Sequence, residues 1–296
     1  MMDLLLDCIT DAGIDTLKLV PFLFITYLVM EAIERRTEEH SGRLIRSERA
    51  GVLGPVFGGL IGIVPQCGFS AAASSLYAGG LISLGTLLAV FLSTSDEMLP
   101  LLISSQVSVA VMAQILLAKA VIGMVTGLAA DLTLRHVFHW SPEAKHIHDL
   151  CEDEHCGCEE EEGSILRAAF VHTLHIALFV LVISVLLNLA VEGFGEEVIR
   201  DVLVGRPILG VFLTAAVGLV PNCASSILIT QLYLDGLIAA GQMMAGLLVG
   251  AGVGLLVLFR TNARHPRENV KITILLYSLG VAWGLLFTLM GVTLIA

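Results

Sequence analysis

The stretch that decides the fold reads VPQCGFSAAASSLYAGGLISLGTLLAVFLSTSDE and runs from Val64 to Glu97. Its composition is that of membrane helix, but a Pro-Gln-Cys-Gly break begins at Pro65 and two carboxylates, Asp96 and Glu97, end it. A charged side chain at the bilayer centre costs about 2.5–3.5 kcal/mol on insertion scales, so membrane proteins keep one where it faces a cavity or binds a ligand. We therefore expect these carboxylates to be functional; the alternative is a short aqueous loop between two helices.

The apolar residues before the carboxylates are too few to cross a membrane. Leu84 to Leu92 is followed directly by Ser93-Thr94-Ser95, whereas a span needs about 20 residues. We expect one span from Leu84 to Ile103 that breaks at the polar residues and then resumes.

A second copy of the pattern begins 156 positions downstream, at Pro221 instead of Pro65. The residues that recur in register include Cys67, Tyr77, Gly80 and Gly85, matched by Cys223, Tyr233, Gly236 and Gly241. Duplicated apolar segments with Gly/Pro interruptions in matching positions are typical of secondary transporters, whose substrate site forms near the membrane midplane. The carboxylates are not duplicated, since Gly252 and Val253 stand opposite Asp96 and Glu97.

The composition places the chain in a lipid bilayer. Of its 296 residues, 56% are hydrophobic and 15% charged, with a mean hydropathy of +0.88; soluble domains have about 25% charged residues. The aqueous segments are too short for a separate folded domain. A nucleic-acid partner and a disulfide framework are not expected.

Each half supplies five apolar segments, so we predict an all-α integral membrane protein of about ten transmembrane segments. The first repeat is expected over residues 1–130 and the second over residues 165–296, with a cytoplasmic loop at residues 131–164. The predicted segments include Leu17 to Ile33 and Met243 to Phe259. An odd number of segments per repeat means that the two repeats are inverted. Arginines after the first span and around Arg260 indicate cytoplasmic loops, which places both termini outside.

The loop between the repeats is rich in acidic residues and carries most of the net charge of −11. It also holds a group of metal-ligand residues: His146, His148, Cys151, His155, Cys156 and Cys158. Their spacing matches no closed structural zinc pattern. We favour a loose accessory metal-capturing loop over a solvated acidic linker.

The candidate ligands inside the membrane are carboxylates, hydroxyls, amides, thiols and imidazoles. They are Asp96, Glu97, Ser93, Ser95, Gln66, Cys67, Asn222, Cys223, His172 and His175. This set suits a divalent metal ion as substrate, with oxygen ligands favouring hard ions such as Mn²⁺ and thiolates favouring softer ions. Each type also has a structural alternative: a buried cysteine is often a small hydrophobe, an amide can satisfy backbone groups freed by the breaks at Pro65 and Pro221, and the histidines can be helix contacts.

Energy for export cannot come from ATP bound to this chain, because none of its lysines lies in a phosphate-binding G-x-x-x-x-G-K-[ST] motif. Exchange with protons is the natural alternative, since carboxylates and imidazoles release protons when they bind metal. No cofactor is required for this chemistry.

The two Pro-x-Cys breaks, the segment STSDEMLP from Ser93 and the His-Thr-Leu run from His172 resemble a family of ten-span heavy-metal exporters, described as manganese transporters or arsenic efflux proteins. The likeness covers nearly the whole chain. It implies an exporter in the inner membrane of a prokaryote. The second break contains Asn222 where the first contains Gln66, so the resemblance leaves open whether both breaks bind substrate.

Three functions are compatible with these features. The first is a secondary-active, proton-coupled exporter of divalent metal, manganese before others. The second is an efflux permease for arsenite or an organoarsenical, in which Cys67 and Cys223 would matter most. The third is a membrane metal sensor without transport. An enzyme is not expected, because the protease motif H-E-x-x-H is absent. The oligomeric state is not indicated.

Overall fold

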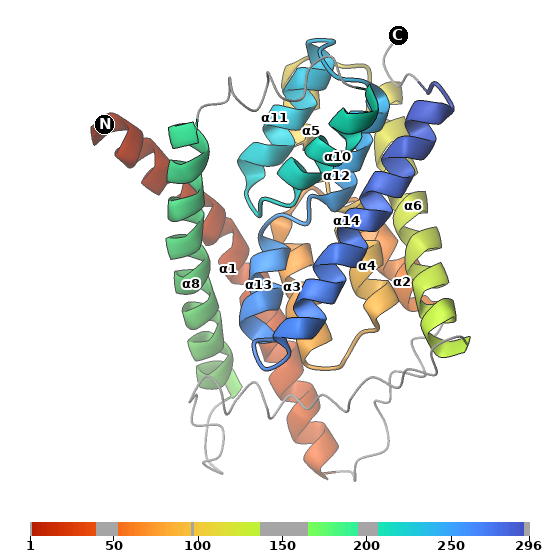
Figure 1. Ribbon diagram of the computed structural model, residues 1–296. Coiled ribbons are helices and arrows are strands. Elements are labelled where there is room, and N and C mark those ends of the chain that lie inside the picture. Colours follow the sequence, from red (N-terminus) through yellow and green to blue (C-terminus); the bar gives the residue numbers. More distant parts are fainter. Residues whose placement is uncertain (1, 40–52, 96–97, 137–164, 195–206, 293–296) are drawn as a thin grey trace.

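The computed structural model describes residues 2–39, 53–95, 98–136, 165–194 and 207–292, and within these ranges the chain forms helices joined by turns, without strands (Figure 1). The helices are α1 (Met2–Glu39), α2 (Leu53–Ile61), α3 (Cys67–Ala78), α4 (Leu84–Ser93), α5 (Met98–Ser104), α6 (Val109–His136), α8 (Ile165–Phe194), α10 (Pro207–Gly218), α11 (Cys223–Leu234), α12 (Ala240–Val249), α13 (Val253–Thr261) and α14 (Pro266–Leu289). The prediction of an all-α chain is confirmed.

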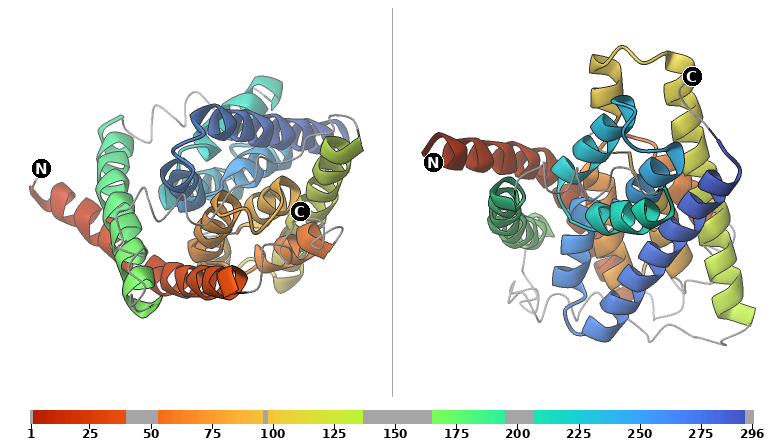
Figure 2. Two further views of the ribbon diagram at one scale, coloured as in Figure 1. Left: turned by 90° about the horizontal axis from the view of Figure 1, so that it is seen from below. Right: turned by 45° about the horizontal axis from the view of Figure 1, so that its top comes forward.

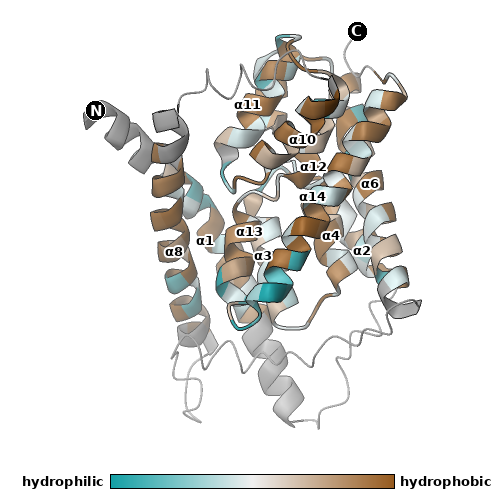
Figure 3. Cartoon of the chain, viewed as in Figure 1, coloured by the Kyte–Doolittle hydropathy of each residue, from teal (hydrophilic) through white to brown (hydrophobic). Residues whose placement is uncertain are grey.

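The described residues contain 6 segments that are long and apolar enough to cross a membrane. Large apolar side chains are exposed on them, such as Leu17, Phe170 and Leu178 with exposed fractions of 72%, 59% and 58%. Hydrophobic residues predominate along these helices in Figure 3. Lipid-facing helices require such a surface, because the bilayer core offers no water to hydrate polar groups. The chain is therefore a membrane protein. Its first helix is longer than predicted, since α1 covers Met2–Glu39 and not only Leu17 to Ile33.

The predicted break before the carboxylates is present. α4 ends at Ser93 and α5 begins at Met98, so the span from Leu84 consists of two short helices. Pro65 and Pro221 likewise lie in turns, between α2 and α3 and between α10 and α11.

A second broken span corrects the prediction of a single segment from Met243 to Phe259. The chain instead forms α12 and α13, with a break at Gly250 to Gly252. The break depends on glycine, because Gly252 has φ 53°, a conformation that other residues rarely adopt. Hydropathy does not reveal it, since the residues on both sides are apolar.

Two pairs of helices, one member from each half, agree in length. α3 and α11 have 12 residues each, and α4 and α12 have 10 each. The turns that follow α3 and α11 use glycines with nearly equal φ, 73° at Gly80 and 71° at Gly236. In Figure 1, α6 descends through the molecule along the chain whereas α14 ascends.

The broken helices lie at the centre, where every residue of α4 and α12 is buried. Small residues allow the close packing. A Cβ on Gly85 would lie 2.2 Å from the Gly127 carbonyl oxygen of α6, and one on Gly241 would lie 2.6 Å from the Gly284 carbonyl oxygen of α14. Close backbone approach through glycine is a common way to associate membrane helices. α1 and α8 pack together at one side of this core (Figure 2).

Candidate functional site

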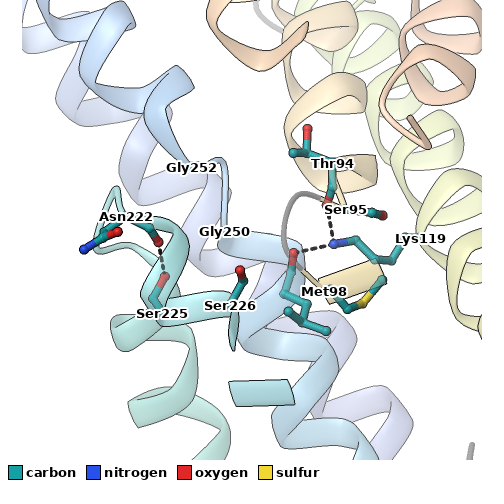
Figure 4. Close-up of a pocket in the computed structure, with 10 residues that line it drawn as sticks. Thr94, Ser95, Met98, Lys119, Asn222, Ser225, Ser226, Gly250 and Gly252 are labelled. Atoms are coloured by element: carbon teal, nitrogen blue, oxygen red, sulfur yellow. Dashed lines mark hydrogen bonds between the residues drawn. The ribbon is translucent and has the colours of Figure 1, made fainter. Parts of the chain in front are cut away.

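A cavity lies where the two broken spans meet (Figure 4). The first half contributes the end of α4, the start of α5 and one side chain of α6, and the second half contributes the start of α11 and the break after α12. The lining residues are Thr94, Ser95, Met98, Lys119, Asn222, Ser225, Ser226, Leu247, Gly250 and Gly252. Each half thus brings its own helix break to a shared polar site within an apolar core.

Side-chain hydrogen bonds are present at both ends of α4. At its start, Asp131 of α6 accepts hydrogen bonds from the Gly85 N–H (2.8 Å) and the Ser83 hydroxyl (2.6 Å). At its end, the Ser93 hydroxyl donates to the Ala89 carbonyl oxygen at 2.7 Å and the Thr94 hydroxyl to that of Val90 at 2.7 Å. These two bonds are made within α4 and occupy carbonyl groups of its last turn, where the final carbonyl groups lack partners within the helix.

Lys119 of α6 is the charged side chain among the described lining residues, and it is only 1% exposed. Its ammonium group donates hydrogen bonds to the carbonyl oxygens of Thr94 and Leu247, the latter at 2.8 Å (Figure 4). Thr94 is the residue that ends α4, and Leu247 lies in the last turn of α12. The ammonium group therefore lies between the carbonyl ends of both broken helices, which carry partial negative charge.

The opposite wall is the start of α11. The Asn222 side-chain oxygen accepts a hydrogen bond from the Ala224 N–H at 3.2 Å, and the Ser225 hydroxyl donates to the Asn222 carbonyl oxygen at 2.8 Å. Asn222 therefore caps the helix, as expected if its amide satisfies backbone groups at the break. It also lines the cavity. Ser226 adds a second hydroxyl one residue further.

Several predicted ligands lie at or next to the cavity. Ser95 and Asn222 line it, and Ser93 is fully buried in the last turn of α4. Asp96 and Glu97 lie outside the described residues, but Ser95 and Met98, their neighbours in the chain on either side, both line the cavity. Cys223 begins α11, and its side chain is likewise not described.

The structure places other predicted ligands away from this cavity. Gln66 precedes α3 and donates a hydrogen bond to the Lys18 carbonyl oxygen at 3.3 Å. Cys67 is buried in a cluster with Leu19, Leu23 and Tyr27. Neither residue lines the cavity.

The histidines of α8 have separate environments. His172 is buried and stacks on Tyr27 of α1 with ring centroids 5.1 Å apart, whereas His175 is exposed. Neither lines the cavity. In the ranges that the structure describes, no three His, Cys, Asp or Glu side chains group as a metal site; the loop set from His146 to Cys158 lies outside those ranges.

Sequence reasoning missed Lys119, Ser225, Ser226 and the glycines of the second break. For Lys119 a signal was present. It is the one lysine in the apolar segment from Val109 to Ala130, and an ionisable residue inside a span indicates a functional site.

Comparison with known families agrees with this architecture. The family model ArsP_2, described as "Putative, 10TM heavy-metal exporter", matches residues 1–193. The match includes the first broken span, Lys119 and the start of the second half. Neither the curated proteins nor the solved structures contain a match to this chain. With a family match over more than half of its length and a core of broken apolar helices, the chain belongs to the ten-transmembrane heavy-metal exporter family.

Proposed function

We propose that this protein is a secondary-active exporter of a divalent metal cation, manganese first, built from two inverted repeats. The opposite course of α6 and α14 and the matching lengths of α3 with α11 and of α4 with α12 support the inversion. In such transporters the substrate and coupling ions bind near the midplane, at discontinuous helices from both halves.

One observation carries the proposal: two helix breaks, one from each half, meet at a single cavity lined by hydroxyl, amide and backbone oxygens. Ser95 and Met98 bracket Asp96 and Glu97 in the chain, so we assign the two carboxylates to this cavity as the anionic ligands. A site of oxygen ligands with two carboxylates favours hard divalent ions over soft ones.

Protons are the proposed coupling ion. Carboxylates that bind a metal must be deprotonated, so binding of the metal releases protons. Protons that bind the carboxylates from the outer side can then displace the metal and so drive export. A pH gradient would then supply the free energy needed to move cations out of an inside-negative compartment, about 2.3 kcal/mol per charge per 100 mV.

The test uses purified protein in liposomes loaded with a Mn²⁺-sensitive dye. Mn²⁺ flux should require a pH gradient and should fall at least about tenfold in Asp96→Asn and in Glu97→Gln, since each removes one anionic ligand. Thr133→Ala, which changes an exposed hydroxyl bonded to its own helix, is the matched control. Absence of flux in the unmodified protein, or flux without dependence on pH, would contradict the proposal.

The second candidate is export of arsenite or an organoarsenical. Lys119 favours it, because a buried ammonium group beside hydroxyls and an amide suits a neutral or anionic oxygen compound better than a cation. The position of Cys67 away from the cavity argues against thiol capture at the first break. The same liposomes loaded for arsenite efflux separate the candidates: arsenite flux that survives Asp96→Asn would replace the manganese assignment.

A further inference from the structure

The carbonyl groups that hold Lys119 belong to the ends of two different broken helices. Thr94 ends α4 of the first half and Leu247 lies in the last turn of α12 of the second, and the ammonium group of Lys119 bonds to both. Carbonyl ends of broken helices are where transporters coordinate small cations. In this structure a protein side chain occupies that position.

A lysine at this position is found on α6 of the first half but not at the corresponding position on α14 of the second half. α6 and α14 correspond through two glycines that meet the broken helices, Gly123 with Gly280 and Gly127 with Gly284. In this register Lys119 corresponds to Leu276, which is fully buried and uncharged. Two repeats that agree at their glycine contacts therefore differ at the position that faces the junction, and only the α6 side supplies a cation.

A metal ion and the ammonium group of Lys119 would not bind these carbonyl oxygens at the same time. Two positive centres that bind one oxygen lie within a few ångström of each other, and in a buried site their repulsion is screened far less than in water. The side chain of lysine is well suited to yield the position, since its charge is carried on a flexible four-carbon stem.

We propose that Lys119 is a tethered cation that the exported metal displaces from the junction of α4 and α12. The inference rests on the proposed function and specifies how its site is filled between transport cycles. With no metal bound, Lys119 satisfies the carbonyl ends of both helices. When the metal has bound, the displaced ammonium group competes for the same oxygens and promotes release, so Lys119 determines the affinity of the site.

The experiment measures Mn²⁺ binding and Mn²⁺ flux for Lys119→Gln, Lys119→Arg and Leu276→Gln. The glutamine amide can still donate hydrogen bonds but carries no charge, so Lys119→Gln should bind Mn²⁺ at least about tenfold more tightly and export it at least about tenfold more slowly. Lys119→Arg should keep an affinity within about threefold of the unmodified protein. Leu276→Gln is the matched control for a new amide in the core, and it should show no gain in affinity.

A second measurement needs no variant. Reductive methylation followed by mass spectrometry reports the accessibility of Lys119, and the protein unfolded in denaturant gives the reference for complete reaction. Lys119 should be protected without metal, because it is buried and hydrogen bonded, and should become reactive when Mn²⁺ is added. This readout remains decisive if Lys119→Gln fails to fold.

The outcomes separate the two proposals. If the unmodified protein binds Mn²⁺ but Lys119→Gln binds it no more tightly, or if Mn²⁺ leaves the reactivity of Lys119 unchanged, the displacement model is wrong and the exporter assignment stands. If the unmodified protein neither binds nor moves Mn²⁺, the exporter assignment is wrong and the inference fails with it.

Discussion

The Ser74 hydroxyl of α3 donates a hydrogen bond to the Gly254 carbonyl oxygen of α13 at 2.7 Å, and so connects residues 180 positions apart in the chain. The two helices are in close contact there, since a Cβ on Gly254 would lie 2.7 Å from the Ser70 Cβ. Gly254 follows the second helix break directly. The contact therefore fixes the break of the second half against a helix of the first half.

Gly254→Ala should lower the stability of the protein, because the added methyl group would overlap the α3 backbone and side chain. Overpacking of this kind costs about 1–3 kcal/mol, and thermal unfolding in detergent would show a lower melting temperature. Gly250→Ala is the control: φ at Gly250 is −65° and the nearest atom to an added Cβ is 3.4 Å away. Equal melting temperatures for both variants would contradict the assigned contact.

Asn222→Ala should impair transport more than Gln66→Ala does. The two residues precede α11 and α3 at matching positions, but Asn222 lines the cavity and caps its helix, whereas the structure gives Gln66 a contact with α1. Loss of the cap alone costs about 1 kcal/mol, and the cavity also loses an oxygen. Mn²⁺ flux in liposomes compares the variants. A larger loss in Gln66→Ala would indicate that the first break binds the substrate.

Cys67 should be protected from thiol reagents in the folded protein. Its side chain is 8% exposed and packs with Leu19, Leu23 and Tyr27, so a bulky reagent cannot reach the sulfur. A variant that retains Cys67 alone, treated with maleimide before and after unfolding, provides the measurement. Rapid labelling in the folded state that Mn²⁺ or arsenite suppresses would instead support the prediction that Cys67 is a ligand.

Much of the fold follows from features that a single sequence displays. Pro65 and Pro221 lie between helices, as predicted, and α4 ends at the polar run that begins at Ser93. Proline and runs of polar residues in an apolar segment can be recognised in a single sequence. The break at Gly252 was not predicted. It depends on a positive φ, and apolar residues around it keep the hydropathy of an unbroken span.

The site was harder to predict than the fold. Residues that could bind a metal recur at matching positions in the sequence, but their side chains need not face the same cavity. Cys67 and His172 match the pattern expected of ligands, yet both are buried where α3 and α8 pack on α1. Lys119 lies far in sequence from both breaks, and only the packing of α6 against α4 brings its ammonium group to the junction. Such proximity depends on helix packing that hydropathy and spacing do not encode.

The contact between Tyr77 and Glu268 distinguishes the two halves and provides the last prediction. The Tyr77 hydroxyl at the end of α3 donates to the Glu268 carboxylate in the first turn of α14, and Asn262 donates to the same carboxylate at 3.3 Å. In the register of α6 with α14, the counterpart of Glu268 is Val111, whose side chain has no hydrogen-bond acceptor. The carboxylate of Glu268 is therefore not repeated at this position of α6.

Tyr77→Phe should therefore destabilise the protein. A hydrogen bond to a charged group contributes about 1.5–3 kcal/mol, and the loss should appear as a lower melting temperature in Tyr77→Phe. The same substitution in a Glu268→Gln background should cost less, since the charged partner is already absent. Mn²⁺ affinity should be unchanged in each variant, because Tyr77 does not line the cavity. Full additivity of Tyr77→Phe with Glu268→Gln would show that the contact contributes nothing to holding α3 against the second half.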